Sequence, residues 1–240
     1  IFEFYYANEM SRAVNSMLDK NLYGFYSLLG VKYQMLSHGK LPDPASLCFS
    51  QTATASSKGL DFFANTCYAG MGFAYENAIS EKEYAALPQE KRHLVSMDAI
   101  VLSEEDLKQY GDWFSIKTAA DYANFDHEDF VRSAGERADR QAQNFSYSNG
   151  CYRFSVSLEK DTVYYVAIPF DQGFSATANG QPTEIVKVHN GLQGLVLQAG
   201  QNDVKIHYFP QGLKAGLAIS GICLRLFVAY LLVKRRKRDV

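Results

Sequence analysis

The stretch that decides the architecture is Ala215 to Val233, which reads AGLAISGICLRLFVAYLLV and is followed at once by Lys234, Arg235, Arg236, Lys237 and Arg238. Its nineteen residues carry one charge, and a helix of that length can cross a hydrocarbon core of roughly 30 Å. Basic residues beside one end are typical of the cytoplasmic side. We therefore predict a transmembrane helix over residues 213–233, a basic cytoplasmic tail over 234–240, and the bulk of the chain in an extracytoplasmic position at the cell membrane.

The one charge in the span, Arg225, lies near its middle, where an arginine costs roughly 2.5–3.5 kcal/mol on insertion scales. Gly221 and Ala229 flank it on the same helical face, and small residues beside a charge favour a face packed against other helices. An arginine that extends toward the headgroups is the alternative. In the packed interpretation, the partners are other transmembrane helices of a longer parent protein, and membrane lipids cover the rest.

The charge balance differs between the two ends of the chain. Seven bases against Asp239 give residues 214–240 a net charge of +6, so the other 213 residues carry −8 of the total of −2. An acidic external part argues against nucleic acid as a partner, because phosphate binding needs clustered Lys and Arg. Ile1–Tyr6 show no signal-peptide pattern. We therefore expect the C-terminal piece of a longer membrane protein.

Immediately before the membrane span, residues 143–210 form a series of short strand patterns. Tyr152, Phe154, Val156 and Leu158 alternate with polar residues. Further strands are predicted at 162–169, 174–178, 185–188, 192–197 and 204–209, with a hairpin turn at Asn179-Gly180. Strands of this length and spacing predict an antiparallel β-sandwich domain over 143–210, and strands of the preceding region are candidates for pairing with it.

Residues 1–142 are predicted to form a mixed α/β region. An amphipathic pattern favours a helix over 8–21, and Val31, Tyr33 and Met35 alternate with Lys32 and Gln34 in a strand over 28–36. The fold class is therefore α+β, with the mixed α/β region followed by the antiparallel β-sandwich and one C-terminal transmembrane helix.

Two short helices in this region carry N-cap signals. Ser80 with Glu83 forms a capping box pattern, and Ser103 with Asp106 repeats it. A buried strand is predicted between the two helices, at 98–102.

The sequence contains no signature of a known catalytic or metal site. A P-loop, a Rossmann fingerprint, H-E-x-x-H and G-x-S-x-G are all absent, so we assign no catalytic residue, no metal ligand and no cofactor. Trp113 and Phe174 are candidate glycan contacts, with core packing as the alternative. Cys48 and Cys67 form the one obvious local pair, and the sequence leaves open whether they form a disulfide.

Several short stretches act together as a family signature. They are LLGVKY at 28–33, GFAYENAIS at 72–80, IPFDQGFSA at 168–176, Asn179-Gly180, VHNGL at 188–192 and GLKAG at 212–216. In combination they resemble segments of the YfhO family of bacterial multi-pass membrane proteins. Phe170 and Phe174 stand where that family often has Tyr and Trp, so a sugar contact carried over from the family is in doubt at these two positions.

The resemblance implies a function. Members of the family are similar to glycosyltransferases that use a polyprenyl-phosphate sugar donor, and some are implicated in glycosylating lipoteichoic acid or related envelope polymers. The family's catalytic acid is expected between early membrane helices, so this fragment alone would not be catalytic. The expected partners are a polyprenyl-linked sugar and an envelope glycopolymer. The alternative is a non-enzymatic, membrane-anchored extracellular module that binds envelope glycan or a protein partner.

Overall fold

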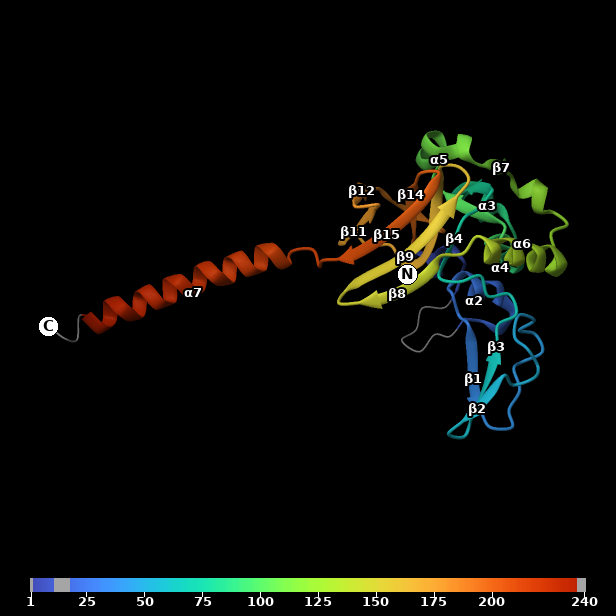
Figure 1. Ribbon diagram of the computed structural model, residues 1–240, viewed down its shortest axis with the longest axis horizontal. Helices are drawn as coiled ribbons and strands as arrows, with labels where there is room; N and C mark the ends of the chain where they lie inside the picture. Colours follow the sequence, from blue (N-terminus) through green and yellow to red (C-terminus); the bar gives the residue numbers. More distant parts are fainter. Residues whose placement is uncertain (1, 11–17, 237–240) are drawn as a thin grey trace.

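Two antiparallel sheets face each other as a β-sandwich in the computed structural model, which describes residues 2–10 and 18–236 (Figure 1). One sheet has the strand order β12-β11-β15-β9-β8 and the other the order β13-β14-β10-β4. The strands are β4 (Gly72–Phe73), β8 (Gln143–Ser148), β9 (Cys151–Leu158), β10 (Thr162–Pro169), β11 (Phe174–Ala178), β12 (Gln181–Thr183), β13 (Ile185–Val188), β14 (Leu192–Leu197) and β15 (Gly200–Tyr208).

The predicted strand bounds hold for β10, β11, β13 and β14, and β8 and β12 were not predicted. β15 begins four residues earlier than the pattern indicated, at Gly200, because it pairs with β9 from that residue onward. β4 comes from the first half of the chain, and its Phe73 lies opposite Tyr165 of β10. Gly72 allows this approach, since a Cβ there would lie 2.9 Å from the Tyr165 carbonyl oxygen.

The burial patterns of β9 and β10 explain how the layers stack. β9 alternates, with Phe154 and Val156 buried and Arg153 exposed, because the outer face of the five-stranded sheet meets solvent. β10 is buried at nearly every position. Its Tyr164 belongs to the core between the two sheets, whereas Tyr165 belongs to a second core on the other side of the four-stranded sheet. The mixed α/β region therefore covers the outer face of that sheet.

The mixed region contains a parallel sheet and several short helices. The sheet order is β6-β5-β7, from β5 (Asn77–Ser80), β6 (Ala99–Leu102) and β7 (Ser115–Lys117). The helices are α1 (Phe2–Ala7), α2 (Gly24–Leu28), α3 (Glu81–Ala86), α4 (Gln89–Val95), α5 (Glu104–Tyr110) and α6 (His127–Asp139), with 3-10 turns η1 (Lys20–Leu22), η2 (Gly111–Trp113) and η3 (Ala119–Tyr122). The hydrophobic core of the mixed region includes buried side chains from both halves of the chain, among them Phe4 of α1 and Leu192 of β14. The two halves therefore share one core.

The predicted N-caps are present at both helices. The Ser80 hydroxyl accepts the Glu83 N–H at 3.1 Å, and the Ser103 hydroxyl accepts the Asp106 N–H at 3.1 Å. The predicted return contact of the Glu83 carboxylate to the Ser80 backbone is wrong, because that carboxylate accepts the Ala119 N–H instead, at 2.8 Å. The caps fix where α3 and α5 begin, and the buried strand predicted between them is β6.

The N-terminal helix α1 is held in place by Arg92 of α4. Its guanidinium donates to the carbonyl oxygens of Ala7 at 3.1 Å, Ala85 at 2.9 Å and Leu87 at 3.0 Å. The predicted helix over 8–21 is not found in the part that the structure describes: α1 ends at Ala7 and η1 begins at Lys20, while residues 11–17 lie outside the described residues.

The strand predicted over 28–36 is shorter in the structure. Residue 28 ends α2, and β1 (Tyr33–Ser37) pairs with β3 (Leu60–Ala64), which also pairs with β2 (Ala55–Ser57). Tyr33 and Met35 are 47% and 60% exposed. The face of this small sheet that packs carries Asp61 and Phe63, which are buried, so Tyr33 and Met35 lie on its exposed face.

Helix α7 (Leu213–Arg236) projects from the body on its own (Figure 1). Its residues 213–231 are apolar and long enough to cross a membrane, and none of that stretch is buried against the rest of the chain. The residues Lys234 to Arg236 continue the helix, whereas Lys237 and Arg238 lie outside the described residues.

Candidate functional site

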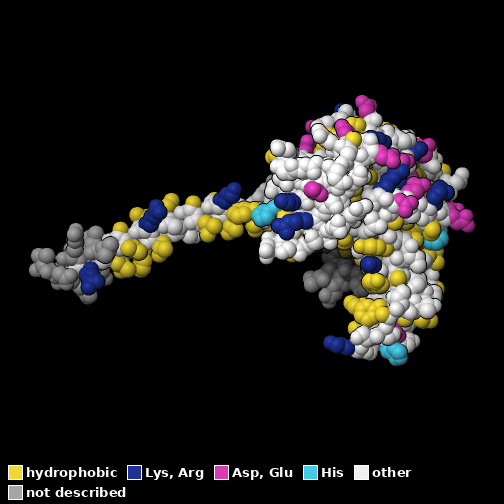
Figure 2. Space-filling model, viewed as in Figure 1, with side chains coloured by type: hydrophobic (Ala, Val, Ile, Leu, Met, Phe, Trp, Pro, Cys, Tyr) yellow, Lys and Arg dark blue, Asp and Glu magenta, His cyan; other side chains and the backbone are white. Residues whose placement is uncertain are grey.

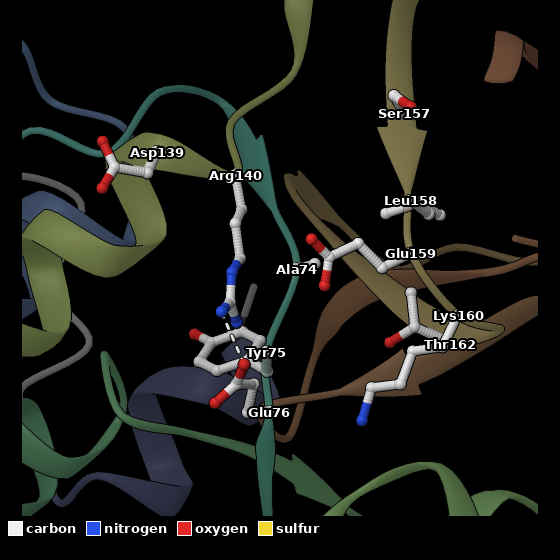
Figure 3. Close-up of a pocket in the computed structure, with 10 residues that line it drawn as sticks. All are labelled: Ala74, Tyr75, Glu76, Asp139, Arg140, Ser157, Leu158, Glu159, Lys160 and Thr162. Atoms are coloured by element: carbon white, nitrogen blue, oxygen red, sulfur yellow. Dashed lines mark hydrogen bonds and ion pairs between the residues drawn. The ribbon is translucent and has the colours of Figure 1, made fainter. Parts of the chain in front are cut away.

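A pocket of about 200 Å³ lies where β9 and β10 meet the mixed region (Figure 3). Its polar wall comes from Glu76 after β4, Arg140 after α6, and Glu159, Lys160 and Thr162 around the turn between β9 and β10. The pairing of β4 with β10 brings these residues together, because continuing that antiparallel register carries the chain after β4 toward the start of β10. The pocket is thus built from both halves of the chain.

An ion pair forms one side of the pocket. Arg140 Nη2 lies 2.5 Å from Glu76 Oε1, with the two side chains 38% and 54% exposed. The hydrogen bond from Arg140 holds the pKa of the Glu76 carboxyl below its ordinary value, so the pair is charged at neutral pH. In Figure 3, Glu159 extends toward Arg140 while Asp139 points away. Guanidinium N–H groups and carboxylate oxygens beside each other offer both donors and acceptors to a ligand.

The hydroxyl of Thr162 is the second feature of the pocket. Thr162 is 2% exposed, and its Oγ1 has no hydrogen-bond partner within residues 2–10 and 18–236. Figure 3 shows this hydroxyl on the pocket side of the strand. Leaving a buried hydroxyl without a partner costs about 1–3 kcal/mol, and this oxygen has almost no surface open to the pocket.

The two predicted glycan contacts lie at different places. Lys160 Nζ donates to the Trp113 carbonyl oxygen at 2.5 Å, which places Trp113 near the pocket, and the Trp113 ring lies 5.0 Å from that of Tyr110. Phe174 packs against Tyr208 with ring centroids 4.7 Å apart, at the end of the sandwich next to α7. The structure therefore does not bring Trp113 and Phe174 into one site.

The pocket lies at the end of the sandwich far from α7. Leu158, at the end of β9, is paired with Gly200, and β15 then runs on to Tyr208 before the helix begins. Eight steps of about 3.3 Å each give roughly 26 Å along the strand. The pocket therefore stands about that far from the end of the sandwich that adjoins the helix.

The residues predicted for helix packing, Gly221, Arg225 and Ala229, follow one another at four-residue intervals along α7. This spacing places them on one face. That face meets no other part of the described chain, so its packing against further helices stays a prediction.

Two buried histidines are unsuited to acid–base chemistry at neutral pH. Burial lowers the pKa of His93 to about 4 and that of His189 to about 3. His189 is 2% exposed, and neither ring nitrogen has a hydrogen-bond partner in the described part of the chain. Its ring lies between those of Tyr75 and Tyr165, at 5.6 and 5.3 Å. Both histidines are neutral packing groups.

Cys48 and Cys67 are both buried free thiols. Burial raises the pKa of Cys48 to about 12 and also raises that of Cys67, so neither is a reactive thiolate. Within the described residues, no group of three or more His, Cys, Asp or Glu side chains is arranged to hold a metal ion.

Sequence reasoning did not single out Glu76, Arg140 or Thr162. Glu76 lies inside the GFAYENAIS stretch, Arg140 ends a weakly patterned charged region, and Thr162 begins a strand. The usable signal was the short Gly72–Phe73 segment, whose glycine and aromatic residue are typical of a strand in close contact with another backbone. Its pairing partner cannot be read from the sequence.

The fold defines the class of protein: an α+β module carried on one helix that is long and apolar enough to cross a membrane. Residues 118–220 match the family described as "Bacterial membrane protein YfhO". The chain is also 30% identical over 98 residues to "Uncharacterized protein YfhO" of Bacillus subtilis (strain 168). Over these residues the chain is similar to the YfhO family of bacterial membrane proteins.

The match to the Bacillus subtilis relative covers 41% of this chain and 11% of that protein. The matched family region contains Arg140, Lys160 and Thr162 but not Glu76. No solved structure matches the chain.

Proposed function

We propose that this chain is the extracytoplasmic, acceptor-side part of a membrane glycosyltransferase that moves a sugar from a polyprenyl-phosphate carrier to an envelope glycopolymer such as lipoteichoic acid. The pocket beside Arg140 binds one sugar or polyol unit of the acceptor. The reacting groups belong to other parts of the parent protein. The observation that carries this proposal is the ion-paired, hydroxyl-lined wall of the pocket, and the family resemblance supplies the reaction.

The polar groups of the pocket suit a polyhydroxylated ligand. The charged pair of Arg140 and Glu76 can accept from and donate to the hydroxyls of a ligand. A volume of about 200 Å³ is below the roughly 300–1,000 Å³ of sites for drug-sized ligands. A single ring or polyol unit is the fitting size.

The position of the pocket favours the acceptor over the carrier. A carrier phosphate remains at the headgroup level, whereas the pocket lies about 26 Å along β15 from the end near α7. A polymer that extends from the membrane can reach this height. The orientation we propose, with the body outside and the C-terminus in the cytoplasm, is supported by the basic residues that follow the span.

Binding to the full chain in nanodiscs tests the proposal. The probes are methyl glycosides of glucose, galactose and N-acetylglucosamine and a glycerol-phosphate oligomer, followed by ligand-observed NMR. Arg140→Ala removes charge-assisted hydrogen bonds and is expected to weaken binding about 10- to 100-fold. Thr162→Val keeps the shape and removes a buried hydroxyl that has no partner, so it should leave binding unchanged without lowering stability.

The matched control is Arg132→Ala. Arg132 lies on α6, the helix that ends just before Arg140. Its side chain is 63% exposed and pairs with Asp129 outside the pocket. Equal affinities for Arg140→Ala, Arg132→Ala and the unaltered chain would remove the pocket from the proposal.

The second candidate function is a non-enzymatic membrane-anchored module that binds envelope glycan or a protein partner. The same distance between the pocket and the helix favours it, since binding at that height needs no lipid carrier. Sugar transfer by membranes that contain the complete parent protein separates the two. In the enzyme, Arg140→Ala should raise the KM for the acceptor and leave kcat largely unchanged. Membranes that bind glycan and transfer no sugar would favour the module.

A further inference from the structure

The end of the sandwich next to α7 lies at the level of the lipid headgroups. The apolar stretch Leu213–Leu231 has 19 residues, which as a helix extend about 28 Å. A hydrocarbon core of roughly 30 Å takes up that whole length. The linker from Phe209 to Gly212 must then cross the headgroup layer, and the last residues of β15 stand at its outer edge.

Aromatic side chains are exposed at this end. Tyr208 and Phe209 are 38% and 37% exposed, and Tyr147 is 62% exposed. The hairpin that carries Tyr147 adjoins the end of β15, because the Tyr208 N–H donates to the Gly150 carbonyl oxygen at 3.5 Å. Lys214 Nζ lies 5.4 Å from the Phe209 ring centre. Such residues are typical of the interface between a membrane and water.

Two cations lie directly opposite each other just above the aromatic side chains. Lys205 of β15 is paired with Arg153 of β9, and both are exposed. Like charges at directly opposed positions destabilise a sheet. Neither has an ion-pair or hydrogen-bond partner for its side chain among the residues that the structure describes. His207 lies two residues nearer to α7 on the same strand. Figure 2 shows Lys, Arg and His side chains gathered where the body meets the helix.

The basic character is confined to the part of this face near the membrane. The next exposed residue of β15 on the far side of Lys205 is Asp203, which lies opposite Ser155. Lys205 is three residues, or about 10 Å, from Tyr208, which is only slightly more than one Debye length of about 8 Å at physiological salt. Asp171 also lies at this end, where it accepts the Gly173 N–H at 2.7 Å. Lys205 and Arg153 together outnumber this one carboxylate, so this end of the sandwich is positive where it lies closest to the lipid phosphates.

We propose that this end of the sandwich docks on anionic phospholipid headgroups and so fixes the orientation of the sandwich and the mixed region relative to the membrane. We call it the headgroup collar, defined by Tyr147, Arg153, Lys205, His207, Tyr208 and Phe209. The phosphates provide the counter-charge that the opposed cations lack within the protein, and a guanidinium can bind a phosphate through two N–H groups. The aromatic rings insert between the headgroups. This inference does not depend on sugar transfer.

The test measures how close the collar lies to the lipids in the full chain. A fluorophore is attached at Thr177→Cys, which lies opposite Lys205 on β11, in a Cys223→Ser background. The chain is placed in nanodiscs of phosphatidylcholine alone or mixed with phosphatidylglycerol, with the same fraction of lipid that carries a nitroxide on its headgroup. A second label at Lys82→Cys, on α3 in the mixed region, reports the other part of the body (Figure 1).

Docking predicts stronger quenching at Thr177→Cys in the discs that contain phosphatidylglycerol. This difference should disappear at a salt concentration of about 0.5 M, because salt screens the attraction. Removing two basic groups near an anionic surface is expected to lower the docked-to-free ratio roughly 30-fold. The variant R153E/K205E should therefore lose the lipid dependence. The control K40E/K108E makes the same change in net charge at two exposed lysines of the mixed region and should keep it.

Equal quenching in the two kinds of disc, or a lipid dependence that survives R153E/K205E, would overturn the proposal. Both positions are exposed, so the variant should melt at the temperature of the unaltered chain. If it does not, R153Q/K205Q replaces it and carries the same expectation.

Discussion

The buried histidine at position 189 predicts that acid weakens the fold. His189 is 2% exposed between Tyr75 and Tyr165, and burial lowers its pKa to about 3. In the unfolded chain its pKa is about 6.5. A group with a lowered pKa in the folded state binds its proton first in the unfolded state. The stability it permits is complete above about pH 6.5 and is lost progressively as the pH falls toward 3.

The magnitude follows from the two pKa values. At pH 5 the unfolded histidine is about 1.5 pH units below its pKa, while the folded one is still neutral, and each unit corresponds to about 1.4 kcal/mol. His189 therefore accounts for a loss of about 2 kcal/mol between pH 7 and pH 5. His93, with its pKa lowered to about 4, adds a similar amount, so the total is about 4 kcal/mol.

His189→Phe keeps an aromatic ring between the two tyrosines and removes both unpartnered nitrogens. The backbone at position 189 is left-handed, with φ of 48°, which Phe tolerates less well than His, while removal of two buried polar atoms works in the opposite direction. The free energy of unfolding at pH 7 is therefore not the decisive quantity. The decisive quantity is its change from pH 7 to pH 5, which should be smaller by about 2 kcal/mol in the variant.

The assay is urea unfolding of the full chain in detergent micelles at the two pH values, followed by the fluorescence of Trp113, the single tryptophan. His207→Gln, at an exposed position, is the matched control and should leave the pH dependence unchanged. If His189→Phe shows the same loss of stability between pH 7 and pH 5 as the unaltered chain, the reasoning from burial is refuted.

Three further predictions concern stability and membrane insertion. Arg92→Ala should destabilise the fold by about 2–4 kcal/mol, because the carbonyl groups of Ala7, Ala85 and Leu87 lose their hydrogen-bond donor. The rate of amide hydrogen exchange in α1 measures this effect, and an unchanged rate would contradict the prediction. Ser103→Ala should cost about 1 kcal/mol through the lost N-cap to Asp106, measured by urea unfolding. Arg225→Leu should lower the apparent free energy of insertion of α7 by about 3 kcal/mol in a translocon insertion assay; no change would indicate that Arg225 extends fully to the headgroups.

The alternation of apolar residues was enough to predict most of the sandwich, because strands with one face in solvent repeat every two residues. β9 is the clearest case, with Phe154 and Val156 inward and Arg153 outward. β10 was found by its length and its β-branched and aromatic residues. Its burial on both faces depends on the mixed region packing against the four-stranded sheet, and that contact joins residues far apart in the sequence.

β1 shows the limit of the same alternation. Tyr33 and Met35 are apolar but exposed, whereas the packed face carries Asp61 and Phe63 of the neighbouring strand. Alternation gives two faces but does not say which one is covered. Asp61 is tolerated on the packed side because it accepts hydrogen bonds from the Ser56 hydroxyl and the Gly39 N–H.

The pocket could not be predicted from the sequence for a related reason. Glu76 and Thr162 come from opposite halves of the chain, and Arg140 follows a helix whose apolar pattern is weak. What joins them is a two-residue strand, β4, whose partner is chosen by packing. A polar residue near such a short strand has no local signal that marks it as part of a cavity.

The position of β4 also limits how this protein can be dissected. A truncation that begins at residue 143 would retain all strands of both sheets except β4. It would leave one edge of β10 without a paired strand, and it would expose the aromatic side chains of the four-stranded sheet that Phe4 and Phe25 now cover. The unpaired backbone N–H and C=O groups of β10 could then pair with other copies of the fragment, so the fragment should self-associate or precipitate. We therefore expect a soluble, monomeric product only when the residues on both sides of position 143 are produced as one piece.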